Sequence, residues 1–482
     1  MFKLAPLSAA IVLAVAGQAM ATDSVSEQSQ QGTENIAEVL QNLAPNATII
    51  QDQTGLGHNH MAVQDTSTSQ IEQTATGSYN AGYGDQIFEN GSTLTQKSGG
   101  SGNDNFASQS LGAENQSLQI QDGVGNRSQV FQDSQMGAKA TTEQKGSGND
   151  AVVEQLFSGS GNKSLIKQEG TGNSAAAEHL FHENGEIKIQ QINSNASWAY
   201  GDQRDGLGGV LEIHQVGTAH NAEVWQDTQI ASSASVYQQG QNNEGYIDQS
   251  FGQGNSVSLS QSGQRNASWS DQFETNQSVT SITQNGNDNL HFTYQNGDNH
   301  SLVISTTGNG NKIQASNWKG DRAGGQFGMG QQAQITQNGY GNTVNITQNG
   351  MEQFAKLGQK GTDNTMLTNQ ADSNNELYFE QNGTDNLLIA DQRDNNNYAA
   401  GLSAGSDNKV TLDQSGQYNQ SYTYQLYGSG NEATIKQVDS ANVAYVTQGG
   451  TNNQAFVDQS SMNQSATITQ YGTANLATVT QQ

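Results

Sequence analysis

The residues of this 482-residue chain that could carry out chemistry are histidines and carboxylates set at regular intervals. His58 and His60 are two residues apart, so on a β-strand both imidazoles would lie on one face and could bind a metal ion. The sequence offers no evident third ligand, and it pairs no histidine with a serine and an aspartate in a repeated geometry. We therefore predict no catalytic residue, no metal site and no cofactor.

Aspartates that immediately precede a glutamine are a second candidate, namely Asp202, Asp248, Asp271, Asp391, Asp413 and Asp458. If they stack, they could bind a cation or a sugar, but the simpler interpretation is that charges at intervals keep the chain soluble and slow premature strand pairing. Gly308 and Gly310 resemble a phosphate-binding loop only superficially, because no helix follows them. Outward aromatic residues are too sparse to predict a site; examples are Tyr378, Tyr422, Tyr424 and Tyr445.

The composition is unusual for a chain of this length. Hydrophobic residues make up 32% and charged residues 13%, there are 55 glycines and no cysteine, and the only prolines are Pro6 and Pro45. More than four hundred residues without proline indicate a backbone whose N–H groups are nearly all hydrogen-bonded. The net charge of −27 excludes binding to the nucleic-acid backbone as a main role and disfavours docking on anionic lipid.

The first 45 residues differ from the rest of the chain. Residues 1–21 have a basic start at Lys3, a short apolar run and a small-residue pattern ending at Ala21, which predicts a secretory signal peptide and a secreted protein. Residues 22–45 form a leader in which Ile36–Leu43 has helical spacing and Pro45 closes the stretch. We predict either a short amphipathic helix or a flexible export-targeting segment there.

A period of eleven residues organises residues 46–482. It is clearest in two runs of glutamine: Gln337, Gln348, Gln359, Gln370, Gln381 and Gln392, then Gln437, Gln448, Gln459, Gln470 and Gln481. Steps of eleven or twelve also join a run from Gln215 to Gln295, and units can be placed back to Gln53. Only four units lack the marker glutamine, with His179, Thr306, Asn317 and Ser403 in its place. A longer step follows Asn317, and within 318–330 the run Trp318–Gly328 is interpreted as a looped-out insertion.

Each unit predicts one strand and one corner. From Asn342 to Gln348, asparagine, two aliphatic residues and glutamine share parity, so they point to one face of a strand. Glycine and other turn-forming residues fill the four positions between a glutamine and the next asparagine. Two units make a coil of about 22 residues, and about 19 stacked coils give an all-β, two-sheet parallel β-solenoid. The alternatives are a disordered Gln/Asn-rich tract and a three-sided β-helix.

Stacked coils place identical amides above one another, so that buried donors and acceptors pair in ladders. Unpaired, each buried amide would cost on the order of 1–3 kcal/mol. The residues we predict to form ladders are Gln337, Asn342, Gln348, Gln359, Asn364, Gln370, Gln381, Asn386, Gln392, Asn431, Gln437, Asn442, Gln448, Asn453, Gln459, Gln470, Asn475 and Gln481.

This Q-x-G-x-x-N-x-A-x-[VIL]-x-Q unit resembles the curlin repeat of bacterial curli fibre subunits. The resemblance implies a subunit secreted unfolded through an outer-membrane pore, which assembles with a nucleator into extracellular amyloid-like fibres for adhesion to host or abiotic surfaces and for biofilm matrix. We therefore predict a structural protein that acts by templated strand stacking, with no nucleic-acid partner. The alternative is a monomeric secreted adhesin or glycan-binding solenoid.

Overall fold

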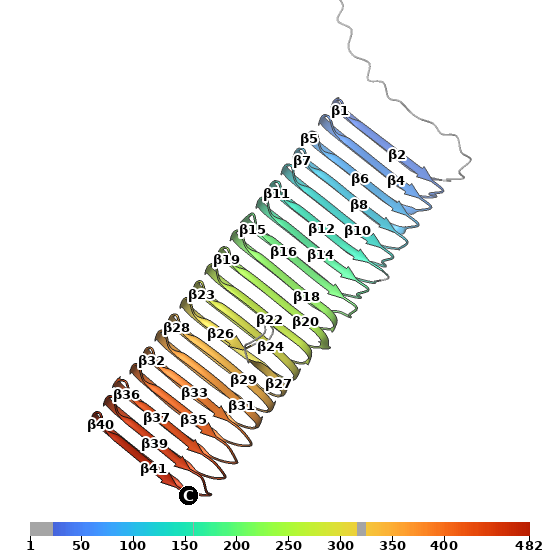
Figure 1. Cartoon of the computed structure of the whole chain (residues 1–482). Coiled ribbons are helices and arrows are strands. Elements are labelled where there is room, and N and C mark those ends of the chain that lie inside the picture. Colours follow the sequence, from blue (N-terminus) through green and yellow to red (C-terminus); the bar gives the residue numbers. More distant parts are fainter. Residues whose placement is uncertain (1–22, 158, 316–323) are drawn as a thin grey trace, which may run out of the picture.

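The computed structural model describes residues 23–157, 159–315 and 324–482, and every regular element in these ranges is a β-strand. Each coil contributes one strand to sheet 1 and one to sheet 2, and the coils stack into a rod (Figure 1). Paired strands are parallel, and residues stacked in neighbouring coils are usually 22 to 24 positions apart. The predicted two-sheet parallel β-solenoid is confirmed. The described residues include no helix long and apolar enough to cross a membrane.

The strands alternate between the two sheets along the chain. Sheet 1 contains β1 (Val25–Thr33), β3 (Thr48–Leu56), β5 (Thr68–Ser78), β7 (Asn90–Ser101), β9 (Gln116–Val124), β11 (Lys139–Ser147), β13 (Lys163–Thr171), β15 (Glu186–Asn195), β17 (Val210–Thr218), β19 (Ser233–Gln241), β21 (Ser256–Gln264), β23 (Val279–Asn287), β25 (Ser301–Asn309), β28 (Gln332–Tyr340), β30 (Phe354–Thr362), β32 (Glu376–Thr384), β34 (Tyr398–Ser406), β36 (Gln420–Ser429), β38 (Val443–Thr451) and β40 (Ser465–Thr473). Sheet 2 contains β2 (Ile36–Asn42), β4 (Asn59–Asp65), β6 (Ala81–Ile87), β8 (Asp104–Ser110), β10 (Arg127–Asp133), β12 (Asp150–Leu156), β14 (Ser174–Leu180), β16 (Trp198–Arg204), β18 (Asn221–Ile230), β20 (Glu244–Gln253), β22 (Ala267–Asn276), β24 (Leu290–Asp298), β26 (Lys312–Ala315), β27 (Gly325–Met329), β29 (Thr343–Met351), β31 (Thr365–Ser373), β33 (Leu387–Gln392), β35 (Lys409–Gln414), β37 (Glu432–Gln437), β39 (Gln454–Gln459) and β41 (Leu476–Gln481).

The core is a narrow layer between the two sheets. Along β21, Val257, Leu259 and Gln261 are buried, while the residues between them are at least partly exposed. This alternation places small aliphatic side chains at the centre of each strand and amides at its edge. The aliphatic residues of successive coils form one continuous apolar cluster. Polar residues can outnumber aliphatic ones inside the rod because most of their buried polar atoms are hydrogen-bonded.

Glycine is required where sheet 1 turns into sheet 2, which we call the first corner. Gly286 has φ +130°, and a Cβ built there would overlap the carbonyl oxygen of Gly308 in the next coil. Glycines recur at this position through most of the rod, each against the glycine of the next coil. Ser194 is an exception, and there β13 and β15 pair with a shift of register, because an extra residue precedes the serine. The corner thus fixes both the residue type and the register.

The prediction of a helix within 22–45 is wrong, because these residues form the first coil. β1 pairs with β3 and β2 pairs with β4, both in continuous register. Asn35, Ala37, Val39 and Gln41 repeat the asparagine, aliphatic, aliphatic and glutamine order of the later units. The apparent helical spacing arose because outward Ile36 and Leu40 are also apolar. The predicted signal peptide, residues 1–21, lies outside the described residues.

The interruption after Ala315 also differs from its prediction. β26 and β27 lie one after the other between β24 and β29, so together they replace a single strand. Gln326, and not Asn317, takes the marker position, since it accepts from Gln295 at 2.7 Å and donates to Gln348 at 2.8 Å. Residues 325–329 of the predicted 318–330 insertion therefore belong to sheet 2, and residues 318–323 lie outside the described residues.

Candidate functional site

The glutamines form two columns of hydrogen-bonded side chains, one against each sheet. In sheet 2, Gln348 donates Nε2–H to Oε1 of Gln370 at 2.8 Å, and Gln370 donates in the same way to Gln392 at 2.9 Å. The second hydrogen of the Gln370 amide goes to backbone carbonyls, that of Phe354 at 2.9 Å among them. Each such amide thus forms hydrogen bonds to the coil before it, to the coil after it and to the backbone. These bonds offset the free-energy cost of burying the amide.

The asparagines form a further column at the first corner, with the opposite direction of donation. Asn386 donates both its backbone N–H and its Nδ2–H to Oδ1 of Asn364, at 3.2 and 2.9 Å. Its Nδ2 also donates to the carbonyl of Gly405 in the next coil at 3.0 Å. In the bonds between side chains, asparagine therefore donates toward the N-terminal end of the rod, whereas glutamine donates toward the C-terminal end.

The structure places all the predicted ladder residues in these columns or in a matching one at the second corner, where sheet 2 turns into sheet 1. Gln337, Gln359, Gln381, Gln448 and Gln470 line sheet 1, and Gln348, Gln370, Gln392, Gln437, Gln459 and Gln481 line sheet 2. Asn342, Asn364, Asn386, Asn431, Asn453 and Asn475 occupy the first corner, and Asn442 occupies the second. All are buried except Asn475 and Gln481, which belong to the last coil.

Three histidines replace asparagine in a corner column and reproduce two of its bonds. Nδ1 of His58 accepts the backbone N–H of Asn80 at 3.3 Å, while Nε2 lies 3.2 Å from the carbonyl of Thr54. His220 and His300 bond in the same way. Since Nδ1 accepts, the proton must be on Nε2, so these rungs need neutral imidazole.

His58 and His60, the candidate metal ligands, are both buried between the sheets. Burial, and after it the neighbouring His58, lower the pKa of His60 to about 4. Within the described ranges, no three histidine, cysteine, aspartate or glutamate side chains lie close enough together to hold a metal ion. His58 belongs to the corner column, and His60 is an inward-facing residue of β4.

The aspartates that precede marker glutamines lie on the outer face of sheet 2, as their parity indicates, but three are more enclosed than the sequence suggested. Asp202 is fully buried and is bonded by Nε of Arg204 at 2.6 Å. Asp248 and Asp271 pair across neighbouring strands. Burial, and after it the charge of Asp248, raise the pKa of Asp271 to about 7. Stacking in register is what brings these carboxylates together.

Sequence reasoning missed an offset of the sheet 1 glutamine column near the N-terminus. Gln51 donates to Gln73, Gln73 donates to Gln96, and Gln96 donates to Gln119 at 2.7 Å. These residues lie two positions before the expected marker, where Ala75 and Ser98 stand instead. The column moves by two residues in β9, which carries inward glutamine at both 119 and 121. The two inward glutamines at 119 and 121 are the feature of the sequence that could have predicted this offset.

A two-coil alternation at the second corner was also missed. From β6 to β22, the corner position three or four residues after the sheet 2 marker residue alternates between a polar residue and glycine. The order is Glu89, Gly112, Gln135, Gly159, His182, Gly206, Gln229, Gly252 and Thr275. A Cβ at Gly112 would meet the side chain of Glu89 at 2.8 Å. Each larger side chain thus fills the space that the glycine of the next coil leaves unoccupied.

Comparison with known proteins agrees with the repeat geometry. The model of the Curlin associated repeat matches residues 139–170, 231–263 and 405–438. Each matched segment begins or ends in sheet 1 and includes at least one complete sheet 2 strand, so each match is longer than one coil and covers strands of both sheets. No curated protein matches the chain. The repeat matches and the stacked glutamine and asparagine columns together assign this chain to the curlin family.

Proposed function

We propose that this protein is a secreted structural subunit of extracellular curli-like amyloid fibres, which act in cell adhesion and biofilm matrix. The curlin family is a structural family, and this supports a role without catalysis. Secretion is proposed from the signal-peptide pattern of residues 1–21 and from family membership. A curli-type nucleator, an outer-membrane secretion pore and host or abiotic surfaces are the partners that the family suggests.

The observation that carries this proposal is that the two end coils match. In the first coil, Gly32, Asn35, Ala37, Val39 and Gln41 follow one another at set spacings. In the last coil the same residue types recur at the same spacings, as Gly472, Asn475, Ala477, Val479 and Gln481. The first coil of one molecule therefore presents the pattern that the last coil of another would receive as its next coil.

The direction of the ladders makes the two ends complementary. Gln459 donates to Oε1 of Gln481 at 2.8 Å, and the Gln481 amide is then oriented to donate onward beyond the last coil. At the other end, Gln41 donates to Gln64 at 2.9 Å, and no described residue donates to its Oε1. One end of the rod offers amide donors and the other end offers amide acceptors. Contact between two molecules is therefore head-to-tail and generates an open filament.

The backbone edges of the end strands supply the rest of the contact. β1 and β2 at one end, and β40 and β41 at the other, each have a described strand on only one side. An exposed strand edge offers unpaired N–H and C=O groups on which another chain can add. Both sheets would thereby continue across the junction in the register seen within the rod.

The test compares fibre growth of the mature chain with that of a donor-end variant, Gln470→Glu/Gln481→Glu. Glutamate keeps the oxygens that accept from Gln448 and Gln459 but has no N–H to donate onward. The matched control is Thr478→Glu/Thr480→Glu, which puts the same charges on the exposed outer face of β41. Each protein is diluted from denaturant and followed by thioflavin fluorescence, electron microscopy and fibre diffraction.

We expect the wild type and the control to form fibres with the cross-β spacing of about 4.8 Å. The donor-end variant should elongate at least about tenfold more slowly while keeping the β-rich spectrum of the monomer. If wild-type protein stays monomeric for days with that spectrum, the monomeric adhesin is the correct function. Equal growth of all three proteins would exclude ladder-directed stacking.

A further inference from the structure

The outer face of sheet 1 carries a continuous row of aromatic rings near the C-terminal end of the rod. We call it the aromatic row: Phe354, Tyr378, Tyr398, Tyr422 and Tyr445, on the successive strands β30, β32, β34, β36 and β38. Consecutive ring centroids are 5.2, 5.7, 5.6 and 4.7 Å apart, and the last two rings are stacked within 6° of parallel. The tyrosines that looked sparse in the sequence are therefore neighbours in the fold.

Local hydrogen bonds hold the rings in place. The hydroxyl of Tyr378 donates to Glu376 at 3.2 Å, and that of Tyr422 donates to Gln420 at 3.3 Å. Tyr445 remains 44% exposed. The row is thus a fixed apolar strip with polar edges that solvent reaches from one side.

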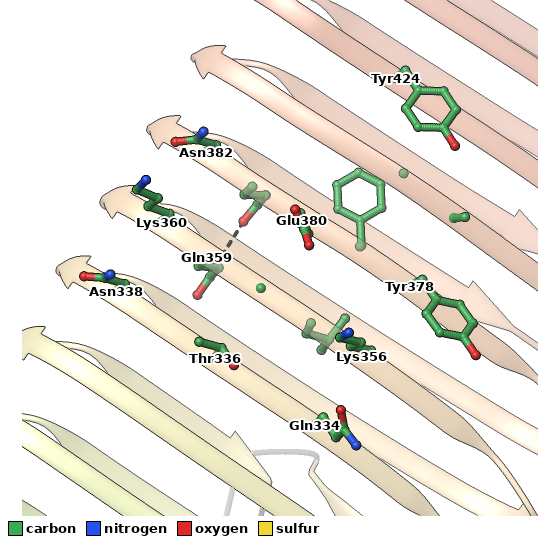
Figure 2. A pocket seen from close by; sticks show the side chains of 16 residues that line it. Gln334, Thr336, Asn338, Lys356, Gln359, Lys360, Tyr378, Glu380, Asn382 and Tyr424 are labelled. Atoms are coloured by element: carbon green, nitrogen blue, oxygen red, sulfur yellow. Dashed lines mark hydrogen bonds between the residues drawn. The ribbon is translucent and has the colours of Figure 1, made fainter.

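A hollow of about 560 Å³ adjoins the row over β28 to β36. The surface is hollowed at Gly358 and Ala400, because these small residues face outward at positions where the neighbouring strands carry larger side chains. Polar side chains stand in lines along the rod beside this hollow (Figure 2). One line is Gln334, Lys356 and Tyr378, and another is Asn338, Lys360 and Asn382. Glu380 and Tyr424 also line the hollow.

We propose that the aromatic row and this hollow bind an extended, uncharged, β-linked glycan laid along the rod. The C–H face of a pyranose ring is apolar and packs on an aromatic ring. Its hydroxyls accept hydrogen bonds from amide and ammonium groups and donate hydrogen bonds to amide oxygens and carboxylates. Both kinds of partner occur here side by side. The ring spacing follows the strand spacing, so a chain that runs across the strands meets one ring at about each sugar.

The charge distribution selects an uncharged occupant. The chain has a net charge of −27, and long-range repulsion therefore opposes a polyanion. The lining of the hollow carries Lys356, Lys360 and Glu380. Glu376 lies outside the hollow, on β32 opposite Phe354 of the aromatic row, and it balances the remaining positive charge of this surface. A glucan of the cellulose type and an N-acetylglucosamine polymer of the chitin type share the required chemistry, and the test separates them.

This proposal does not depend on fibre formation. The row lies on the side of the rod, whereas the proposed assembly contacts are at the two end coils. Binding should therefore occur with soluble protein as well as with fibres, and failure of one proposal leaves the other standing.

The test measures binding of the soluble mature chain to cellohexaose and chitohexaose by calorimetry, with a polyuronate as the charged comparison. The variant Tyr378→Ala/Tyr422→Ala/Tyr445→Ala removes three rings of the row, and Tyr378→Phe/Tyr422→Phe/Tyr445→Phe keeps them. The matched control, Tyr79→Ala/Tyr340→Ala, removes two rings that are 58% and 59% exposed and lie elsewhere. Circular dichroism verifies that each variant retains the solenoid.

We expect at least one uncharged hexasaccharide to bind, about tenfold more weakly to the alanine variant and within about threefold to the phenylalanine variant and the control. Which hexasaccharide binds identifies the source of the glycan. The proposal is overturned if neither uncharged sugar binds, if only the polyuronate binds, or if the folded alanine variant binds as well as the wild type.

Discussion

Asn243 donates its backbone N–H to Nδ1 of His220, which lies one coil earlier at a position where most coils carry asparagine; the distance is 3.4 Å. The other ring nitrogen of His220 lies 3.0 Å from the carbonyl of Val216. The imidazole thus replaces two of the bonds of a ladder asparagine. A proton on Nδ1 would point at the N–H of Asn243 and break this rung, and burial lowers the pKa of His220 accordingly.

The first prediction is that His220→Asn makes this coil resistant to acid. The folded pKa lies below the ordinary 6.5, so the unfolded chain binds more protons as the pH falls through that value, and wild-type stability decreases. We expect hydrogen exchange at the Asn243 amide to be slower in the variant at pH 5 and similar at pH 7.5. Asn266→His, the reciprocal change, should create a new acid-sensitive rung. Equal exchange in wild type and H220N at pH 5 would contradict this mechanism.

The second prediction concerns the glycine column. Gly286→Ala should lower the free energy of unfolding by more than about 3 kcal/mol, because its Cβ would overlap the backbone of the next coil. Gly102→Ala is the matched control, since Gly102 also has positive φ but faces open space, and it should cost only about 1 kcal/mol. Urea unfolding of both variants measures the difference, and equal losses would show that the close contact is unimportant.

A third prediction tests the amide columns. Gln348→Leu has nearly the same volume but leaves the amide of Gln326 without its acceptor and the Oε1 of Gln370 without its donor. At about 1–3 kcal/mol for each unpaired group, we expect a loss of about 2–5 kcal/mol. Thr347→Leu, the outward neighbour, should change stability by no more than about 0.5 kcal/mol. Similar unfolding midpoints for the two variants would refute the stabilising role of the column.

A fourth prediction follows from Asp271, whose pKa is raised from 3.8 to about 7. Between these values the folded state holds a proton that the unfolded state lacks, so this group lowers stability as the pH rises. The slope is at most about 1.4 kcal/mol per pH unit. Asp271→Asn should flatten this dependence and be more stable than wild type at pH 8. Asp458→Asn, which changes an exposed aspartate at the equivalent position of β39, is the matched control, and an equal effect of the two substitutions would contradict this prediction.

Much of the fold could be predicted because one strand and one corner repeat. Parity within Asn342–Gln348 separates inward from outward residues, and the constant step fixes which residues stack. The same reasoning failed where the frame became irregular. It placed a marker at Asn317 where the structure has Gln326, and it expected a helix at Ile36–Leu43 although Asn35, Ala37, Val39 and Gln41 already carried the repeat.

The sequence alone determined the period, the two-sheet solenoid and the inward amides, because a strand alternates its side chains strictly and a glycine corner ends it. The tertiary structure decided which residues become vertical neighbours. Coils of 22 to 24 residues stack only in the register that their corners allow, and such contacts join positions too far apart to be read locally. The aromatic row and the Asp248–Asp271 pair are products of that register, because their members meet only when separate coils are stacked.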